Sequence, residues 1–181
     1  MPSRDEICTY THRYMNPLAA KASDIVIEDI AHALSLMTRA NGHFPEFYSV
    51  GQHCISCHDE AKARGYSDRL VLACLLHDAG EAYLSDMTRP IKHHMNYYNE
   101  AEGRLLSLIY TKFLGSDLTE EEAGLVKSVD DAMLYHEFMH YMQVGLFESA
   151  PAIASVPVFE FQEFKQVEKD YLSRFHALTG K

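Results

Sequence analysis

Residues 77–81 (HDAGE) hold the densest group of side chains that could do chemistry, and further candidates lie on expected helices before and after them. His77 and Asp78 are adjacent, so a helical step of about 100° separates their directions but lets both border one cavity. Two imidazoles and two carboxylates could thus meet from three helices: His53, His77, Asp78 and Asp130. This donor set suits one divalent metal ion (Zn, Co, Mn, Fe or Mg) that keeps open positions for water.

Each of these side chains also has an ordinary structural interpretation. His53 could be a hydrogen-bonded, partly buried histidine, and His77 with Asp78 could form an ion pair at a helix end. An unpaired carboxylate buried after a mostly apolar stretch would be very costly, however, and a cation would offset that cost. Asp131 is the alternative to Asp130, although the apolar spacing of its helix places Asp130 at the edge of the apolar face and Asp131 nearer solvent.

This pattern resembles the signature of the HD-domain metal-dependent phosphohydrolases: a His, then a His-Asp pair that ends an apolar helix, then a distant Asp. The match consists of these segments: 28–39, 47–53, 75–82, Asp86, 89–92 and 126–130. It spans roughly residues 10–140. The chain is similar to the branch that contains bacterial 5′-deoxynucleotidases and short phage enzymes that hydrolyse deoxynucleoside triphosphates. Within this branch, the phage enzymes look most similar to this chain.

The resemblance implies roles for other polar residues beside the four metal ligands. Glu81 and Asp86 match carboxylates that work next to the metal, with Glu81 the favoured acid/base and Asp86 the second choice. Arg39, Lys92 and Pro90 match positions that contact substrate. A carboxylate near a metal can orient an attacking water or move its proton, and a guanidinium can hold phosphate oxygens bidentately. Without the resemblance, each charged group could equally be a cap or a solvated surface residue.

The sequence departs from the family pattern next to Arg39. An aromatic residue usually follows this arginine, but Ala40 stands there. The expected ring for stacking on a base is therefore missing, and Phe44 or Tyr48 could replace it. Pro90 could pack on the base or simply shape its loop.

The resemblance implies a metal-dependent phosphohydrolase of deoxyribonucleotides. The phage branch suggests a deoxynucleoside triphosphate triphosphohydrolase, with dATP giving deoxyadenosine and triphosphate as one case. The alternative is a 5′-deoxynucleotidase that releases phosphate from deoxynucleoside monophosphates. A third interpretation is a nucleotide-binding sensor without turnover, which the presence of both Glu81 and Asp86 argues against. Relatives form dimers or larger assemblies, so we expect a homo-oligomer.

Residues 136–140 read HEFMH, a literal HExxH zinc-protease motif and the main rival enzyme class. A third zinc ligand would have to come from downstream, with Glu160 or Glu163 as candidates. At about 100° per residue, Glu137 falls about 20° from Asp130, whereas the two histidines lie about 120° and 80° away. The protease interpretation therefore uses another face of the helix and leaves the HDAGE segment unexplained.

Residues 54–58 read CISCH, which matches the haem-attachment string CxxCH. Haem attachment needs export and an open loop, whereas this segment is expected to be helical and no apolar export segment is seen. Buried reduced thiols are the favoured interpretation of the cysteines. Cys57 lies one turn after His53, so a thiolate near the metal remains an alternative.

The composition is that of a globular protein. The 181 residues are 47% hydrophobic with a formal charge of −10, which argues against a nucleic-acid polymer as partner. No apolar run approaches the roughly 20 residues that span a bilayer. We expect one domain over residues 1–181, no membrane partner and a cytoplasmic location, which is the host cytoplasm if the protein is phage-encoded.

Periodic apolar residues predict helices throughout, and we expect an all-α HD-domain bundle without convincing strands. One expected helix ends near Asn41-Gly42. Another is capped by Ser67 or Asp68 and has the apolar body 70–76, which leads into His77-Asp78. The others cover these residues: 49–64, 98–114, 120–146 and 159–178. A capping box, Thr119 to Glu122, should start the longest helix. Residues 85–96 and 150–157 are expected to be loop and linker because prolines and small polar residues cluster there.

Overall fold

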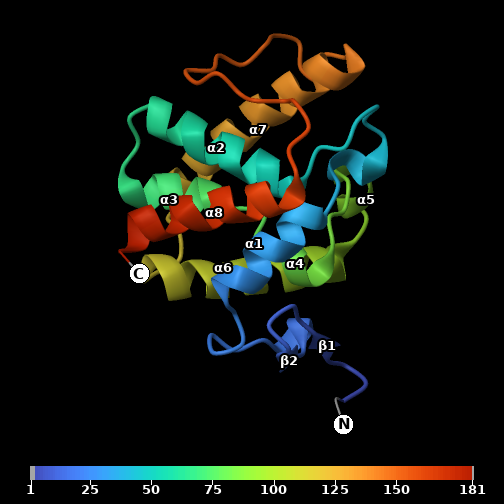
Figure 1. The fold of residues 1–181 in the computed structure, drawn as a ribbon, viewed down its shortest axis with the longest axis vertical. Helices are drawn as coiled ribbons and strands as arrows, with labels where there is room; N and C mark the ends of the chain where they lie inside the picture. Colours follow the sequence, from blue (N-terminus) through green and yellow to red (C-terminus); the bar gives the residue numbers. More distant parts are fainter. Residues whose placement is uncertain (1–2, 181) are drawn as a thin grey trace.

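A computed structural model describes residues 3–180 and confirms the prediction of an all-α bundle (Figure 1). The eight α-helices are α1 Ile27–Leu36, α2 Val50–Ala63, α3 Asp68–Leu76, α4 Glu81–Leu84, α5 Arg89–Lys92, α6 Asn96–Leu114, α7 Glu120–Met142 and α8 Phe164–Thr179. Short 3-10 turns cover Pro17–Ala19 and Arg39–Gly42. Within the described residues, no helix is long and apolar enough to cross a membrane.

Helix α2 lies at the centre of the bundle, where it contacts α1, α3, α7 and α8. Its start is fixed by a capping box in which the Ser49 hydroxyl accepts from the Gln52 N–H and the Gln52 side chain accepts from the Ser49 N–H. Gly65, at φ +75, follows its C-cap. The predicted helix over residues 49–64 is therefore confirmed to within one residue at each end. Its buried position carries the polar His53 into the interior.

Helix α3 is almost entirely apolar and delivers residues 77 and 78 to the centre of the molecule. Every residue from Val71 to Leu76 is buried, so α3 packs on all sides rather than on one stripe. The Ser67 hydroxyl caps its first turn. At its other end, the buried Tyr171 of α8 donates a hydrogen bond of 2.8 Å to the Leu75 carbonyl, which satisfies an acceptor that the ending helix leaves open.

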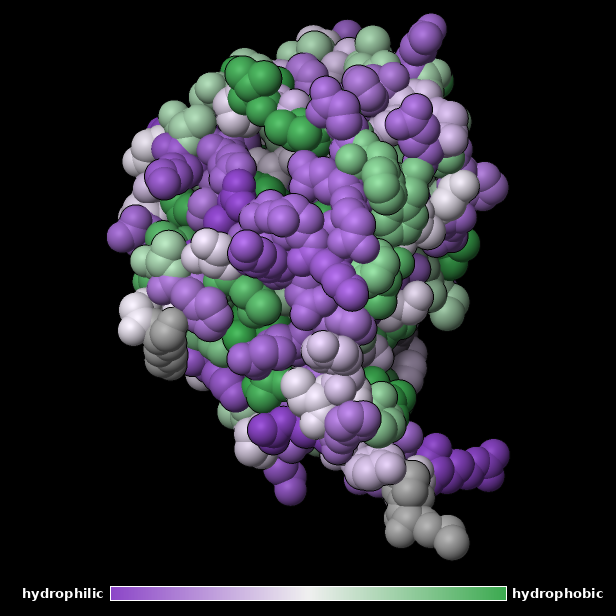
Figure 2. Space-filling view, viewed as in Figure 1, coloured by the Kyte–Doolittle hydropathy of each residue, from purple (hydrophilic) through white to green (hydrophobic). Residues whose placement is uncertain are grey.

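Helix α7 begins as predicted, with Thr119 and Glu122 forming a capping box. Arg69 of α3 donates to the Glu122 carboxylate at 2.7 Å, which joins the first turns of the two helices. The face of the molecule seen in Figure 2 is mostly hydrophilic, as expected where each surface helix turns its polar side outward.

Three predicted helix boundaries are wrong. Helix α1 ends at Leu36 rather than near residues 41–42, because Met37 is extended and Thr38 pairs with Ser49 in an antiparallel bridge. Helix α7 ends at Met142 rather than residue 146, because Gln143 adopts a left-handed conformation (φ +55). Helix α8 starts at Phe164 rather than residue 159.

Several small elements were not predicted, and the single-turn helix α4 is one of them. The expected loop 85–96 contains α5, in which Pro90 lies in the first turn, where its missing N–H leaves no hydrogen bond unmade. An antiparallel pair, β1 Ile7–Cys8 with β2 Tyr14–Met15, forms a hairpin at one end of the molecule (Figure 1). Strands of two residues are too short to produce a detectable alternation of polar and apolar residues.

Gly51 allows α2 to approach its neighbours closely. A Cβ atom there would lie 3.0 Å from Cγ1 of Val167 and 3.2 Å from the Leu34 carbonyl. We expect Gly51→Ala to lower the free energy of unfolding by about 1–3 kcal/mol through overpacking. Gly124→Ala is the matched control: that helical site has open space, so the change should stabilise α7 by up to about 1 kcal/mol. Urea unfolding measures both, and equal stabilities would contradict this packing.

Candidate metal centre

The four predicted metal ligands meet at one point, from α2, the residues after α3, and α7. His53 Nε2 lies 3.1 Å from His77 Nε2 and 3.2 Å from Asp130 Oδ1. Asp78 Oδ2 lies 3.3 Å from His77 Nε2 and 3.8 Å from His53 Nε2. The distance from His77 Nε2 to Asp130 Oδ1 is also 3.8 Å. Donor atoms held about 2.0–2.2 Å from one ion lie about 2.9–3.5 Å apart. Three of the five distances are in this range, and the two of 3.8 Å would have to shorten when a divalent metal binds.

The hydrogen bonds of both imidazoles leave Nε2 as the metal-binding atom. His77 Nδ1 lies 2.8 Å from the Cys74 carbonyl oxygen, and His53 Nδ1 lies 2.5 Å from Glu137 Oε1. Since these oxygens accept, each Nδ1 carries a hydrogen and the neutral ring presents a lone pair at Nε2. Two lone pairs 3.1 Å apart repel one another. A cation between them, a proton or a metal ion, removes that repulsion.

The electrostatics of the cluster also favour a cation. Burial by itself lowers the pKa of His77, but the Asp78 and Asp130 carboxylates outweigh burial and raise it to about 9. Burial likewise raises the pKa of both carboxyls. His77 and Arg39 beside Asp78, and His53 and His77 beside Asp130, nevertheless hold the two pKa values well below the ordinary range. Both carboxylates are therefore ionised and available as ligands at neutral pH.

Glu137 is a part of this centre that the sequence analysis assigned only to the rival HExxH motif. It is fully buried, with Oε1 on His53 Nδ1 and Oε2 at 3.5 Å from Nη2 of Arg39. Nη1 of Arg39 in turn lies 3.4 Å from Asp78 Oδ2. One carboxylate thus orients a candidate ligand and joins it to the arginine expected to contact substrate. The small helical angle between Glu137 and Asp130 was the sequence feature that could have placed Glu137 at this centre.

The two histidines of the HExxH motif do not join Glu137 at the centre. His136 Nε2 lies 2.9 Å from the Pro151 carbonyl oxygen, and the exposed His140 packs against the ring of Phe159. Glu163, one of the suggested third ligands, caps α8. Neither histidine belongs to a group of potential ligands found among residues 3–180.

Three of the four cysteines, Cys54, Cys57 and Cys74, are buried, whereas Cys8 is exposed in β1. Cys57 Sγ lies 3.6 Å from His53 Nε2, and two sets of atoms that include thiols, His53–Cys57–His77 and Cys54–His77–Asp78, are close enough to share an ion. Burial raises the pKa of the Cys54 and Cys57 thiols, so they stay protonated and bind metal less readily than the ionised carboxylates. Their burial within α2 also leaves no surface for haem attachment.

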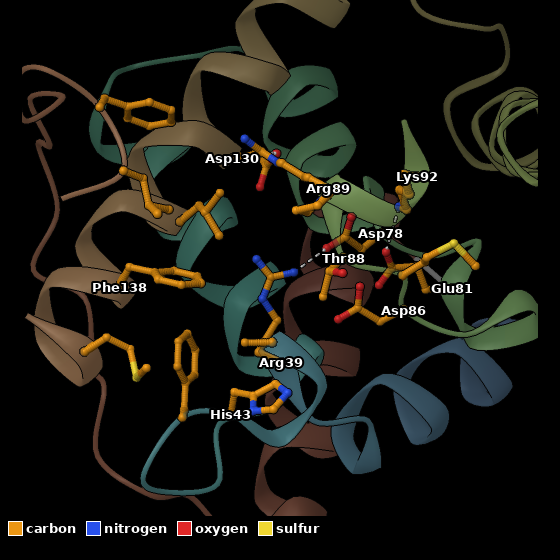
Figure 3. Close-up of a pocket in the computed structure, with 18 residues that line it drawn as sticks. Arg39, His43, Asp78, Glu81, Asp86, Thr88, Arg89, Lys92, Asp130 and Phe138 are labelled. Carbon is orange, nitrogen blue, oxygen red and sulfur yellow. Dashed lines mark hydrogen bonds and ion pairs between the residues drawn. The ribbon is translucent and has the colours of Figure 1, made fainter. Parts of the chain in front are cut away.

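A cavity of about 600 Å³ opens onto the two aspartates (Figure 3). All predicted catalytic and substrate-contacting residues line it: Arg39, Glu81, Asp86, Pro90 and Lys92. Of the two aromatic residues considered as replacements for a ring at position 40, Phe44 lines this cavity. Tyr48 is fully buried, with its hydroxyl 3.2 Å from that of Ser56.

Glu81 has one carboxylate oxygen without a hydrogen-bond partner, although the side chain is only 3% exposed. Its other oxygen accepts from Lys92 Nζ at 3.3 Å. Burial, together with the Asp78 and Asp86 carboxylates, raises the pKa of Glu81 well above its ordinary value. A buried polar atom left unpaired at a cavity wall is suited to a water molecule or to substrate. A cation at the neighbouring ligands would lower the pKa of Glu81 again.

Arg89, which carried no assigned role in the sequence analysis, also reaches the centre. Its Nη2 donates to Asp130 Oδ2 at 2.7 Å, while Asp130 Oδ1 faces His53. Nη1 lies 2.8 Å from Asp131 Oδ1, in an ion pair without the angles of a hydrogen bond. Asp131 also pairs with Lys127 on the outside of α7. The structure therefore places Asp130, rather than Asp131, among the candidate ligands.

Adjacent aspartates provide a matched test of the ligand assignment. We expect Asp130→Asn to weaken Mn²⁺, Co²⁺ or Zn²⁺ binding by more than about 100-fold, because a neutral amide replaces an ionised donor. Asp131→Asn removes only exposed ion pairs and should leave affinity within about threefold. Competition with a chelator measures both. The reverse order of effects would move the ligand to Asp131.

Glu137→Gln tests the hydrogen bond that orients His53. The amide oxygen still accepts but carries no charge, so the imidazole becomes a weaker donor to metal and affinity should fall about 10- to 100-fold. Glu168→Gln is the control, since Glu168 pairs with His32 Nδ1 at 3.0 Å away from the centre. An unchanged affinity in Glu137→Gln, or an equal loss in the control, would contradict the role of Glu137.

No protein-family model matches the chain. Among curated proteins, uncharacterized protein YfdR of Escherichia coli (strain K12) is 37% identical over 90 residues, which cover 50% of this chain and 48% of the relative. Uncharacterized protein RCAP_rcc00048 of Rhodobacter capsulatus is 38% identical over 107 residues, or 56% and 54% of the two chains. The chain therefore spans about half the length of the curated relatives it matches. Neither name states an activity, so the geometry of the site is the basis for the functional argument.

Proposed function

We propose that this protein is a divalent-metal-dependent phosphohydrolase of deoxyribonucleotides, of the HD-domain type. The observation that carries the proposal is the meeting of two buried imidazole Nε2 atoms with two ionised carboxylates, Asp78 and Asp130, that line a cavity. The same cavity is lined by Glu81, which has an unpaired carboxylate oxygen. Hydrolysis at phosphorus requires an activated water and neutralised phosphate charge. The residues around this cavity are suited to both tasks.

The cations of the cavity support a phosphate ligand. The chain has a formal charge of −10, yet Arg39, Arg89 and Lys92 line the same cavity as the acidic cluster. Arg39 is only 9% exposed and contacts both Glu137 and Asp78, so its guanidinium is fixed in place before substrate arrives. A planar guanidinium held in this way can donate two parallel hydrogen bonds to phosphate oxygens.

In the mechanism we propose, His53, His77, Asp78 and Asp130 would hold the ion, which when bound supplies a Lewis acid and lowers the pKa of water. The attacking water forms a bond to the α-phosphorus, and the bond from this phosphorus to O5′ breaks. Glu81 accepts the proton of the water at its unpaired Oε2 and passes it to the departing O5′, while Lys92 orients Glu81 through Oε1. Arg39 and Lys92 neutralise the phosphate oxygens.

The substrate we favour is a deoxynucleoside triphosphate, dATP being one case, with triphosphate as the product. Three cationic side chains lining one cavity match the charge of a polyphosphate better than that of a single phosphate. The alternative is release of phosphate from a 5′-deoxymononucleotide. Incubation with all eight deoxynucleotides, as mono- and triphosphates, and several metals distinguishes them by product: triphosphate, phosphate, or neither for a sensor. We place this activity in the cytoplasm, in a homo-oligomer, by analogy with the resembled family.

Glu81→Gln tests the proton transfer. The amide keeps size and much of the hydrogen bonding but cannot act as a base, so we expect turnover about 10²- to 10⁴-fold slower at saturating substrate and metal. Metal content should be unchanged, because no candidate ligand is altered. Glu102→Gln is a matched control: its carboxylate also accepts from Lys92 Nζ, at 2.7 Å, but does not line the cavity.

Near-normal turnover in Glu81→Gln would remove Glu81 from the mechanism and leave the role to Asp86. Equal losses in the two variants would assign the effect to the position of Lys92 instead.

A double variant, His136→Ala with His140→Ala, tests the protease interpretation. It should retain phosphohydrolase activity, since both histidines lie away from the cavity.

A further inference from the structure

The cavity has a second, apolar side that the proposed chemistry does not use. It is formed by these side chains: Phe44, Leu134, Phe138, Met142, Leu146 and Phe147, here called the apolar wall. In Figure 3, Phe138 lies across the cavity from Glu81 and Lys92, with Arg39 between them. Charged groups therefore gather on one side of Arg39 and hydrocarbon on the other.

Helix α7 supplies three of the six residues of this wall, spaced four residues apart. Asp130, Leu134, Phe138 and Met142 all line the cavity, so one row along the helix runs from the candidate metal ligand to the apolar wall. Gln143, in the left-handed region, ends the helix. The chain then turns back, so that residues 146 and 147 return to the same cavity.

The wall is rigid at its base and open at its rim. Phe44 is 7% exposed and meets the Phe138 ring edge-on, with centroids 5.2 Å apart. At the rim, Met142, Leu146 and Phe147 are each about 40% exposed. The Phe147 ring stacks on Tyr135 at 5.9 Å, which fixes its orientation. Exposed apolar side chains that converge on a cavity are typical of a ligand site.

We propose that the apolar wall is the nucleobase subsite, which holds the base by stacking and shape; this inference rests on the proposed function. A planar aromatic base matches a wall of phenyl rings and aliphatic side chains, while the phosphates lie with Arg39 and Lys92. Ala40, where a ring is expected, is small and leaves this side of the cavity open.

The wall also sets an expectation for base specificity. Of the labelled polar side chains in Figure 3, His43 and Arg39 lie next to the apolar wall. Since we place Arg39 with the phosphates, His43 is the side chain left to donate or accept a hydrogen bond at a base edge. A single hydrogen bond changes affinity by about tenfold. The enzyme should accept all four deoxynucleotides with KM values within about tenfold of one another.

Two variants of the wall test the subsite. Phe138→Ala and Phe147→Ala should each raise KM for a deoxynucleotide about 5- to 150-fold, the usual loss for one stacked base, with little change in kcat. Hydrolysis of 2-deoxyribose 5-phosphate, which has no base, should not respond. Phe161→Ala is the control, since this phenylalanine is 61% exposed and lies outside the cavity. Phe147→Ala, at an exposed position, remains informative if Phe138→Ala fails to fold.

Binding of deoxyadenosine to the same proteins, measured by equilibrium dialysis, separates the subsite from catalysis. Binding that is lost in Phe147→Ala but kept in Phe161→Ala supports the subsite even if no nucleotide is hydrolysed, an outcome that would overturn only the proposed function. Equal KM values and equal deoxyadenosine binding in wild type and both wall variants would overturn the subsite. Absence of deoxyadenosine binding by the wild-type protein, or more than a 100-fold preference for one base, would also overturn it.

Discussion

The approach of two imidazole Nε2 atoms to 3.1 Å inside the bundle is the constraint on which the rest of the site depends. Each ring is held by an acceptor at Nδ1, so neither can turn away. The buried lone pairs and the two nearby carboxylates need positive charge between them, because uncompensated buried charge is costly. At the edge of this cluster, the Arg39 guanidinium balances negative charge by forming ion pairs with Glu137 and Asp78. A cation at the centre, either a proton shared by the imidazoles or a metal ion, would compensate the rest, and our proposal is the metal ion.

The starts of α2 and α7 could be predicted because their signals are local. Ser49 with Gln52, and Thr119 with Glu122, satisfy N–H groups within one turn, and both helices begin there. Helix ends depended on contacts that periodicity does not contain. Helix α1 stops where Thr38 pairs with Ser49 across eleven residues, and this turn moves Arg39 off the helix and toward α7. An apolar repeat that continues beyond such a turn extends the predicted helix too far.

The candidate site also has a part that could be predicted from the sequence and a part that could not. The approach of the four candidate ligands to one another, with Glu81 on the adjoining cavity, could be predicted because their spacing along three expected helices matches a known sequence pattern. Glu137 was assigned to another motif, since its role comes from His53, which is 84 residues away in the chain. Arg89 was overlooked because an exposed arginine in a loop has no sequence signal that distinguishes it from a solvated charge. Its contact with Asp130 exists only once α5 is placed beside α7.

Helix α7 shows why the metal centre and the proposed base subsite are linked. Asp130 and Phe138 are eight residues apart on one continuous helix, a rise of about 12 Å that side-chain packing cannot change. Glu137, beside Phe138, reaches back to orient His53. A rigid helix with both functions fixes the distance between the reacting phosphate and the base, so a substrate whose base lies on the wall has its phosphate at the ligands. In this arrangement the length of the substrate would be selected together with its shape, with at most few polar contacts to the base.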